Sequence, residues 1–351
     1  MLIYILIALL PLWVCNLYNR LPDSRKSAVV RDKYLFWTML PIFLLIAFRH
    51  SSIGSDTGMY LLDLTRFSSM DLKSALEDTR QEAGFVVFTK MIGYITSSPQ
   101  LYQVIYTSIY FVSFFLFARK QENDLPFYFL FFFITLGEYL FFFTAVRQCI
   151  AISFCLLSFI FWSEKKYIFT GLFLFLAYTF HHSAILFVII YPMMMRKVTR
   201  YNIILYLIIM YIGSSYLLEA QMFLNEQLDY VYEIEKVDSG LIFLSLLSIL
   251  SVLAYVYVFK RSSSSKYAVI FFNANIITLF FWFLRLQTRV AERPSFYFLP
   301  FSCFLFANMY KNVRDQFTRN CILIIPFLYF VYRFFTTYIT FVPYRTFFSE
   351  I

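Results

Sequence analysis

The chain has 351 residues, of which 60% are apolar, 23% aromatic and 15% charged, and its formal net charge is +9. Apolar runs long enough to cross a hydrocarbon core of about 30 Å recur along it, which excludes a soluble globular protein. The positive charge is concentrated in short connecting segments, as membrane-protein loops require, so it does not indicate nucleic-acid binding. The absence of GxxxxGK[ST] and GxGxxG motifs in a chain with eight glycines excludes a nucleotide-driven motor.

In chain order, the apolar segments predict an all-α integral membrane protein with about twelve transmembrane helices in one polytopic domain, residues 1–351. The first segment begins at Met1 without a basic flank or cleavage site, so we interpret it as a retained span rather than a signal peptide. The predicted spans are 2–18, 34–48, 101–118, 127–143, 147–162, 167–181, 183–195, 201–217, 241–259, 267–284, 295–310 and 320–340.

The distribution of basic residues predicts the orientation of these spans. Segments 20–33, 119–120, 164–166, 196–200, 260–266 and 311–319 hold 18 of the 30 basic residues and fall on one side, which the positive-inside rule makes cytoplasmic. Both termini and the acidic loop from Glu219 to Asp238 then face outward. The run from Phe85 to Thr96 is too short to cross the membrane. Residues 49–100 are therefore expected to form a long outer-face loop after the second span, containing a short re-entrant or surface helix.

Polar side chains gather at the outward ends of the predicted spans. The loop RHSSIGSDTGMY contains Arg49 and a prominent carboxylate, Asp56, among small residues that permit tight turns. Arg147 and Gln148 open a span, where a bound phosphate would meet free backbone N–H groups and a guanidinium together. An interfacial arginine that reaches toward the headgroups is the alternative interpretation of Arg147.

The segment LRLQTRVAERPSFYFLP carries the second set of outward arginines. Arg285, Arg289 and Arg293 are spaced i, i+4, i+8 and would form one stripe if the segment were helical as far as Pro294. Glu292 would neutralise part of this stripe.

The three histidines, His50, His181 and His182, also fall at outward ends of spans. Without an HxxH, HExxH or DxD-type pattern they predict no metal site, and a titrating or hydrogen-bonding role is favoured. Polar groups at this depth usually line a cavity, although simple hydrogen bonding at the interface is the alternative.

Six motifs in the same order as their counterparts resemble the EpsG family of bacterial polysaccharide polymerases, which includes many Wzy-type O-antigen polymerases. They are RHSSIGSDTGMY (Arg49 to Tyr60), QEAGF (Gln81 to Phe85), VRQCIA (Val146 to Ala151), FHHSAIL (Phe180 to Leu186), RVAERPSFYFLP (Arg289 to Pro300) and the terminal VPYRTFF, which contains Tyr344.

The resemblance implies a glycosyltransferase of the broad GT-C type in the bacterial inner membrane, with its active site facing the periplasm. Its donor would be a growing glycan on undecaprenyl pyrophosphate, and its acceptor a lipid-linked O-antigen repeat unit, with no cofactor and no nucleic acid. Besides membrane lipids, a chain-length regulator is a candidate partner. A flippase for the same lipid-linked oligosaccharide and an O-antigen ligase are the alternatives.

The resemblance also suggests roles for individual residues. Arginines in a low-dielectric cavity would stabilise the departing pyrophosphate. The base candidates are Asp56, His181 and Glu82, and Asp56 is favoured because a carboxylate near a cationic cluster stays ionised. The expected pyrophosphate- or substrate-binding residues are Arg49, Arg147, Gln148, Arg289, Arg293, Tyr60, His182 and Tyr344.

Overall fold

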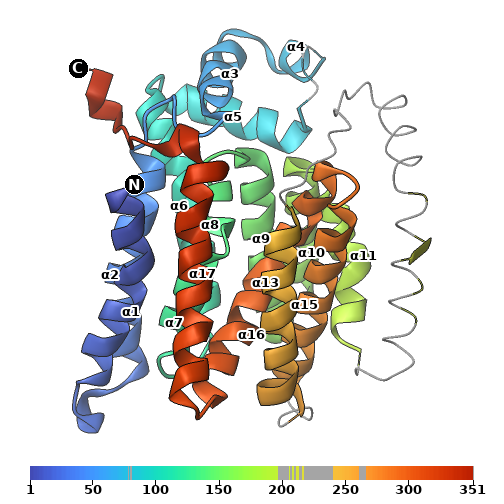
Figure 1. The fold of residues 1–351 in the computed structure, drawn as a ribbon. Helices are drawn as coiled ribbons and strands as arrows, with labels where there is room; N and C mark the ends of the chain where they lie inside the picture. The colour runs from blue at the N-terminus through green and yellow to red at the C-terminus, as the bar shows by residue number, and fades with distance from the viewer. Residues whose placement is uncertain are drawn as a thin grey trace. The chain divides into compact units, whose positions relative to one another are not determined.

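A computed structural model describes residues 1–77, 79, 81–196, 205, 208, 211, 212, 216, 240–260 and 266–350. All regular secondary structure in these residues is helical (Figure 1), apart from one isolated antiparallel bridge between Arg49 and Thr346. The predicted span 201–217 and the acidic loop from Glu219 to Asp238 lie outside the described residues, except for isolated positions within the span.

Six of the described helices are long and apolar enough to cross a membrane. The chain is therefore an integral membrane protein, as its composition predicts. These helices are Leu2–Asn19, Pro99–Ala118, Val146–Ser163, Gly240–Phe259, Lys266–Leu284 and Gln316–Thr336. Every other predicted span, apart from 201–217, also has a described helix, but the total of twelve crossings stays a prediction.

The chain divides into two compact units, residues Met1–Ile185 with Ile324–Ile351, and Leu186–Leu323. The helices of unit 1 are α1 (Leu2–Asn19), α2 (Ala28–Ala47), α3 (Thr57–Ser69), α4 (Leu72–Glu77), α5 (Ala83–Ile95), α6 (Pro99–Ala118), α7 (Leu125–Thr135), α8 (Glu138–Phe141), α9 (Val146–Ser163) and α10 (Tyr167–Phe180), together with the short helices η1 (Asp23–Arg25), η4 (Ile339–Phe341) and η5 (Phe347–Glu350).

Unit 2 contains most of the remaining helices. They are α11 (Ala184–Met194), α13 (Gly240–Ala254), η2 (Tyr255–Phe259), α15 (Lys266–Leu284), η3 (Arg289–Tyr297) and α16 (Leu299–Asn312). Helix α17 (Gln316–Thr336) begins in unit 2 and ends in unit 1.

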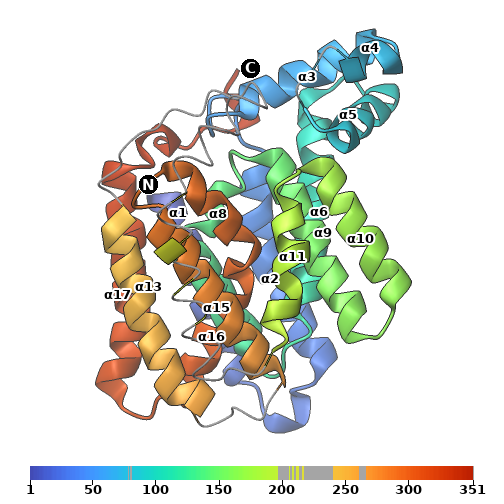
Figure 2. The same ribbon diagram turned by 90° about the vertical axis from the view of Figure 1, so that its right-hand side faces the viewer.

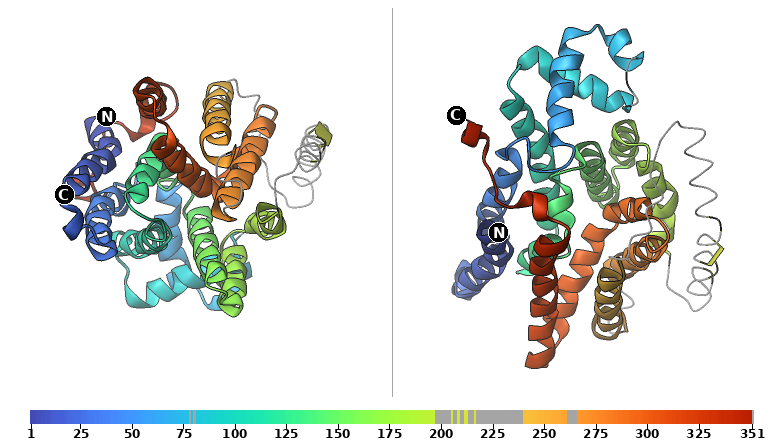
Figure 3. Two further views of the ribbon diagram at one scale, coloured as in Figure 1. Left: turned by 90° about the horizontal axis from the view of Figure 1, so that it is seen from below. Right: turned by 45° about the horizontal axis from the view of Figure 1, so that its top comes forward.

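Helix α9 is central to unit 1, because it packs against both α6 and α10, as Figure 2 shows. Helix α1 packs against α2 and α7, and the two blue helices α1 and α2 lie side by side in Figure 3. Aromatic rings fill the space between helices: Phe114 of α6 contacts Phe133 of α7 and Phe142 at centroid distances of 4.8 and 5.1 Å. This packing makes a rigid base for the polar residues at the helix ends.

The segment 49–100, which the sequence predicted to be an outer-face loop with one short helix, contains three helices, α3, α4 and α5. The three lie together at one end of unit 1 (Figures 1 and 2). Helix α3 forms because Tyr60, Leu64 and Phe67 recur at helical spacing and are all buried. Helix α5 has 13 residues and lies at this end of the bundle, as expected for the short apolar run.

The basic connecting segments of unit 1 meet at the opposite end. Arg31 donates to the backbone oxygens of Arg119 and Gln121, and Arg119 pairs with Asp32 at 3.0 Å. Lys120 forms an ion pair with Glu164. The connections after α1, α6 and α9 therefore lie on the same side of unit 1, as the loop charges predict.

Candidate functional site

A single carboxylate, Glu82, contacts several polar residues at the end of unit 1 that carries α3 to α5. Glu82 lies immediately before α5 and its side chain is only 3% exposed. It accepts hydrogen bonds from Arg147 Nη1, from His181 Nδ1 at 2.7 Å and from the backbone N–H of His182 at 3.3 Å. Arg147 is in the first turn of α9, and His181 follows the last residue of α10. Three helix ends therefore converge on Glu82.

A close backbone approach makes this convergence possible. A Cβ atom added at Gly84 would lie 2.5 Å from the hydroxyl oxygen of Thr179 and 2.6 Å from its carbonyl oxygen. Only glycine allows the first turn of α5 to come this near to the end of α10. Because Thr179 is two residues before His181, this contact also sets the distance from Glu82 to the imidazole.

The cluster keeps Glu82 ionised. Burial alone would raise the pKa of this carboxyl, but the hydrogen bond from His181 and the positive charge of Arg147 outweigh burial and lower the pKa to about 2. An ionised carboxylate can only accept hydrogen bonds. The proton in its bond with His181 is therefore on Nδ1, and in the neutral tautomer of this imidazole Nε2 is the proton acceptor.

Tyr60 and Asp63, both on α3, complete the cluster. The hydroxyl of Tyr60 forms a hydrogen bond with the Arg147 side chain, and burial raises the pKa of Tyr60 to about 12. Asp63 accepts a hydrogen bond from the Gln81 amide, and burial raises the pKa of its carboxyl as well. Arg147 thus lies between a carboxylate and a neutral phenol, with its side chain 20% exposed.

Arg49 has a different environment from Arg147. It is wholly buried and donates to the backbone oxygens of Ile46 and Ile53 and to the hydroxyls of Thr57 and Tyr106. These bonds fold the start of the outer segment back on α2 and α6. The expected contact of Arg49 with a pyrophosphate stays a prediction, and in this structure its guanidinium has protein partners instead.

The other predicted residues of unit 1 are near this end but have separate contacts. Asp56 is the residue before α3, half-buried, and its carboxylate accepts a 2.8 Å hydrogen bond from Ser55. Gln148 is buried in α9. The ring of His182 lies against Tyr178, with centroids 5.0 Å apart.

The C-terminal segment fixes the start of the outer segment. Tyr344 donates to the backbone oxygen of Leu45 at 2.8 Å, and the carbonyl of Arg345 accepts from the N–H of His50 at 3.0 Å. Burial raises the pKa of the Tyr344 phenol to about 12. In this structure Tyr344 therefore stabilises the outer segment; the expected contact with substrate stays a prediction.

In unit 2 the arginines do not form the single stripe that a continuous α-helix as far as Pro294 would give. Helix α15 ends at Leu284, and residues 289–297 form the 3-10 helix η3, which contains Pro294. With three residues per turn, Arg289 and Arg293 point about 120° apart instead of sharing a face. Arg285 is buried and pairs with Glu292, as the expected neutralisation requires. Arg289 is exposed and Arg293 half-buried.

Among the described ranges, no group of three or more His, Cys, Asp or Glu side chains is arranged to hold a metal ion. The polar groups that meet around Glu82 are its own carboxylate, the imidazole of His181 and the guanidinium of Arg147.

The EpsG family model matches residues 33–346, nearly the whole chain. The chain belongs to the EpsG family. EpsG-type proteins are Wzy-like polymerases, so membership associates the chain with polysaccharide polymerisation and glycosyltransferase-like activity in a membrane. No curated protein and no solved structure matches the chain in the corresponding searches.

Three of the EpsG-like motifs supply the cluster: QEAGF supplies Glu82, VRQCIA supplies Arg147 and FHHSAIL supplies His181. The sequence predicted these residues but not their mutual contacts. It gave no role to Gln81, which lies in the QEAGF motif, and it missed Asp63. The helical spacing of Tyr60, Leu64 and Phe67 was the available signal, since it places Asp63 one turn beyond Tyr60 on α3.

Proposed function

We propose that this EpsG-family protein polymerises oligosaccharide repeat units linked to undecaprenyl pyrophosphate, at the periplasmic face of the bacterial inner membrane. The observation that supports this most directly is the binding of both Arg147 and His181 by Glu82. Glycosyl transfer from a lipid pyrophosphate needs a base for the attacking hydroxyl and a cation for the leaving group. One buried carboxylate holds one of each.

In the proposed reaction, Nε2 of His181 takes the proton from a sugar hydroxyl of the acceptor. The hydroxyl oxygen forms a bond with the anomeric carbon of the donor as the bond from that carbon to the pyrophosphate oxygen breaks. The electron pair leaves with the pyrophosphate, whose added negative charge Arg147 stabilises. A single displacement of this kind inverts the anomeric centre.

The electrostatics of the cluster favour His181 over Glu82 as the base. A carboxylate with a pKa of about 2 has little tendency to take a proton near neutral pH, because a general base works best when its pKa is near the working pH. Glu82 instead fixes the tautomer and orientation of His181. Asp56, which the sequence favoured as the base, accepts a hydrogen bond from the hydroxyl of Ser55.

Charge balance suggests that Arg147 does not bind pyrophosphate alone. Glu82 compensates the charge of Arg147, so this ion pair by itself carries no net charge. Arg289 and Arg293 are on the 3-10 helix η3 of unit 2, and their expected part in binding the substrate stays a prediction.

Purified protein in lipid nanodiscs, supplied with lipid-linked repeat units, provides the test. We expect His181→Gln to slow polymerisation by about 10²- to 10⁴-fold, the usual contribution of a general base. His50→Gln is the matched control, because His50 is half-buried at the same end and contacts Ser52 rather than Glu82. Substantial turnover by His181→Gln would remove the base assignment. Flippase or ligase activity would instead leave no polymer in this assay even with the unaltered protein.

A further inference from the structure

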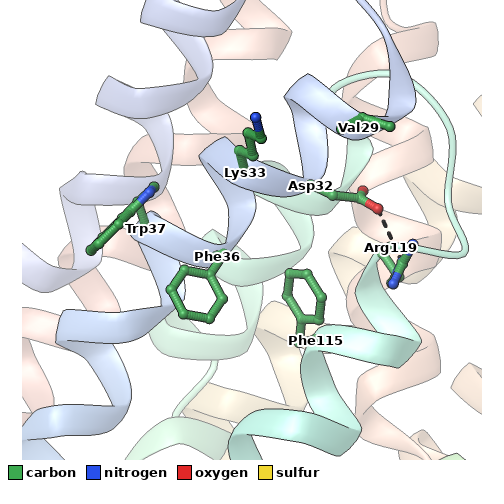
Figure 4. Close-up of a pocket in the computed structure, with 7 residues that line it drawn as sticks. All are labelled: Val29, Asp32, Lys33, Phe36, Trp37, Phe115 and Arg119. Carbon is green, nitrogen blue, oxygen red and sulfur yellow. Dashed lines mark ion pairs between the residues drawn. The ribbon is translucent and has the colours of Figure 1, made fainter.

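A groove in unit 1 lies far along α2 and α6 from the Glu82 cluster, at the end where the basic connections meet (Figure 4). Its volume is about 320 Å³, and its lining includes Asp32, Lys33, Phe36, Trp37, Phe115 and Arg119. The charged residues belong to the ends of the two helices, and the aromatic residues follow one turn further along each helix. The groove therefore has a polar part and an apolar part.

The polar part is positively charged and preorganised. Asp32 accepts a hydrogen bond from Arg31 at 2.7 Å and forms an ion pair with Arg119, whose Nε lies 3.0 Å from the carboxylate, so it holds both guanidinium groups. Among the residues that the structure describes, Lys33 has no ion-pair partner, whereas Arg119 pairs with Asp32. Three cations, Arg31, Lys33 and Arg119, and one carboxylate, Asp32, leave a net charge of +2.

The apolar part faces outward from the helix pair. The rings of Phe36 and Phe115 meet edge to face, with centroids 6.1 Å apart, and Figure 4 shows Trp37 directed away from them. Trp37 is 67% exposed. Tryptophan in this position, one turn inside the charged ends of membrane helices, is typical of the boundary between headgroups and acyl chains.

We propose that this groove binds an anionic phospholipid, with its phosphate between Lys33 and Arg119 and an acyl chain along Phe36 and Trp37. Charge complementarity selects the anionic headgroup, because a choline ammonium would add positive charge beside a site that already carries +2. The attraction between a basic side chain and anionic lipid headgroups falls off within a Debye length of the membrane surface. The charged residues of the groove are at the helix ends, where this attraction is strongest. The proposal is independent of the polymerase reaction, since the groove shares no residue with the Glu82 cluster.

Quenching of tryptophan fluorescence by brominated lipid tests the proposal on the full chain. The protein is reconstituted with a fixed fraction of brominated phosphatidylglycerol or brominated phosphatidylcholine, and the Trp37→Phe protein supplies the background from the other tryptophans. We expect Trp37 to be quenched preferentially by phosphatidylglycerol. Equal quenching by the two lipids would overturn the proposal.

Lys33→Gln is the decisive variant, because it removes a cation of the groove without breaking an ion pair to any residue that the structure describes. Its apparent affinity for phosphatidylglycerol should fall about fivefold, the effect of one basic residue near an anionic surface. Lys73→Gln is the control, as Lys73 is a highly exposed lysine on α4 at the other end of unit 1. An unchanged lipid preference in Lys33→Gln would contradict the proposal. Displacement of the lipid by excess inorganic phosphate would assign the groove to free phosphate instead, and persistent quenching would support the lipid.

Discussion

Glu82 holds its cluster together, because its ionised carboxylate accepts hydrogen bonds from Arg147, His181 and the backbone of His182. A neutral amide at this position can still accept hydrogen bonds but cannot compensate the guanidinium charge. We expect Glu82→Gln to lower polymerisation strongly, although Glu82 takes no proton in the proposed reaction. The polymerisation rate of Glu82→Gln should also depend on pH differently from that of the unaltered protein, because the imidazole of His181 then titrates without its carboxylate partner.

The same residue predicts a pH dependence of stability. The folded-state pKa of Glu82, about 2, is below that of an unfolded glutamate, so ionisation stabilises the fold by about 3 kcal/mol. This stabilisation is complete above the unfolded pKa of about 4.3 and is lost as the pH falls toward about 2. The difference in Tm between the unaltered protein and Glu82→Gln, measured in detergent, should therefore shrink below pH 4. A difference that stays constant from neutral to acid pH would show that the charge of Glu82 is not its source.

Arg147 should not be replaceable by lysine. Its guanidinium bonds both Glu82 and Tyr60, and a lysine ammonium lacks the planar geometry of a guanidinium toward a carboxylate or a phosphate. We expect Arg147→Lys to lose most polymer while the protein still inserts. Arg66→Lys, on the exposed face of α3, should be nearly neutral. Full-length polymer from Arg147→Lys would mean that this arginine serves only to anchor the helix end.

At the scale of elements, the turn before α3 depends on Gly54. Its φ is +90°, and a Cβ added there would lie 2.0 Å from the carbonyl oxygen of Phe143. Gly54→Ala should therefore destabilise the protein by about 2 kcal/mol or more, through backbone strain and this clash. Gly58→Ala is the control, because Gly58 is helical and a Cβ meets nothing within 4 Å; a helical Gly→Ala change should be neutral or stabilising. Comparable Tm losses in both variants would refute this explanation.

Sequence periodicity predicted long single helices well and interrupted ones poorly. The bounds of α1, α6 and α9 agree with the predicted spans to within two residues, because continuous apolar runs must satisfy their backbone internally in lipid. The span 127–143 is instead two helices separated at Gly137, whose φ is +88°. The arginine spacing near Arg289 suggested an α-helix, but Pro294 cannot donate a backbone hydrogen bond and the segment is 3-10 helical.

The site could be predicted residue by residue but not as an arrangement. Glu82 and His181 are 99 positions apart, and no spacing rule connects residues on separate helices. The sequence does predict that His181 lies at the end of a helix, and in the structure Glu82 also lies at a helix end. The contact between Gly84 and Thr179, which brings those ends together, depends on packing that only the structure shows.

For the whole molecule, the orientation in the membrane determines which solvent reaches the Glu82 cluster. The basic connections of unit 1 meet at one end and α3 to α5 lie at the other, so the positive-inside rule predicts that Ser55 faces the periplasm and Ser24 the cytoplasm. Both serines are exposed. Four native cysteines are buried, and only Cys321 is half-exposed, which makes labelling of introduced cysteines feasible in a Cys321→Ala background.

In intact cells with a permeabilised outer membrane, a membrane-impermeant maleimide should label Ser55→Cys. Ser24→Cys should react only after the inner membrane is also opened. The prediction depends on an odd number of crossings between the two positions, and α2 is the helix between them. Labelling of Ser24→Cys alone in intact cells would place the Glu82 cluster in the cytoplasm, where a lipid-linked repeat unit could not reach it after transfer across the membrane. That result would exclude the proposed polymerase reaction at this cluster, whatever the effect of His181→Gln.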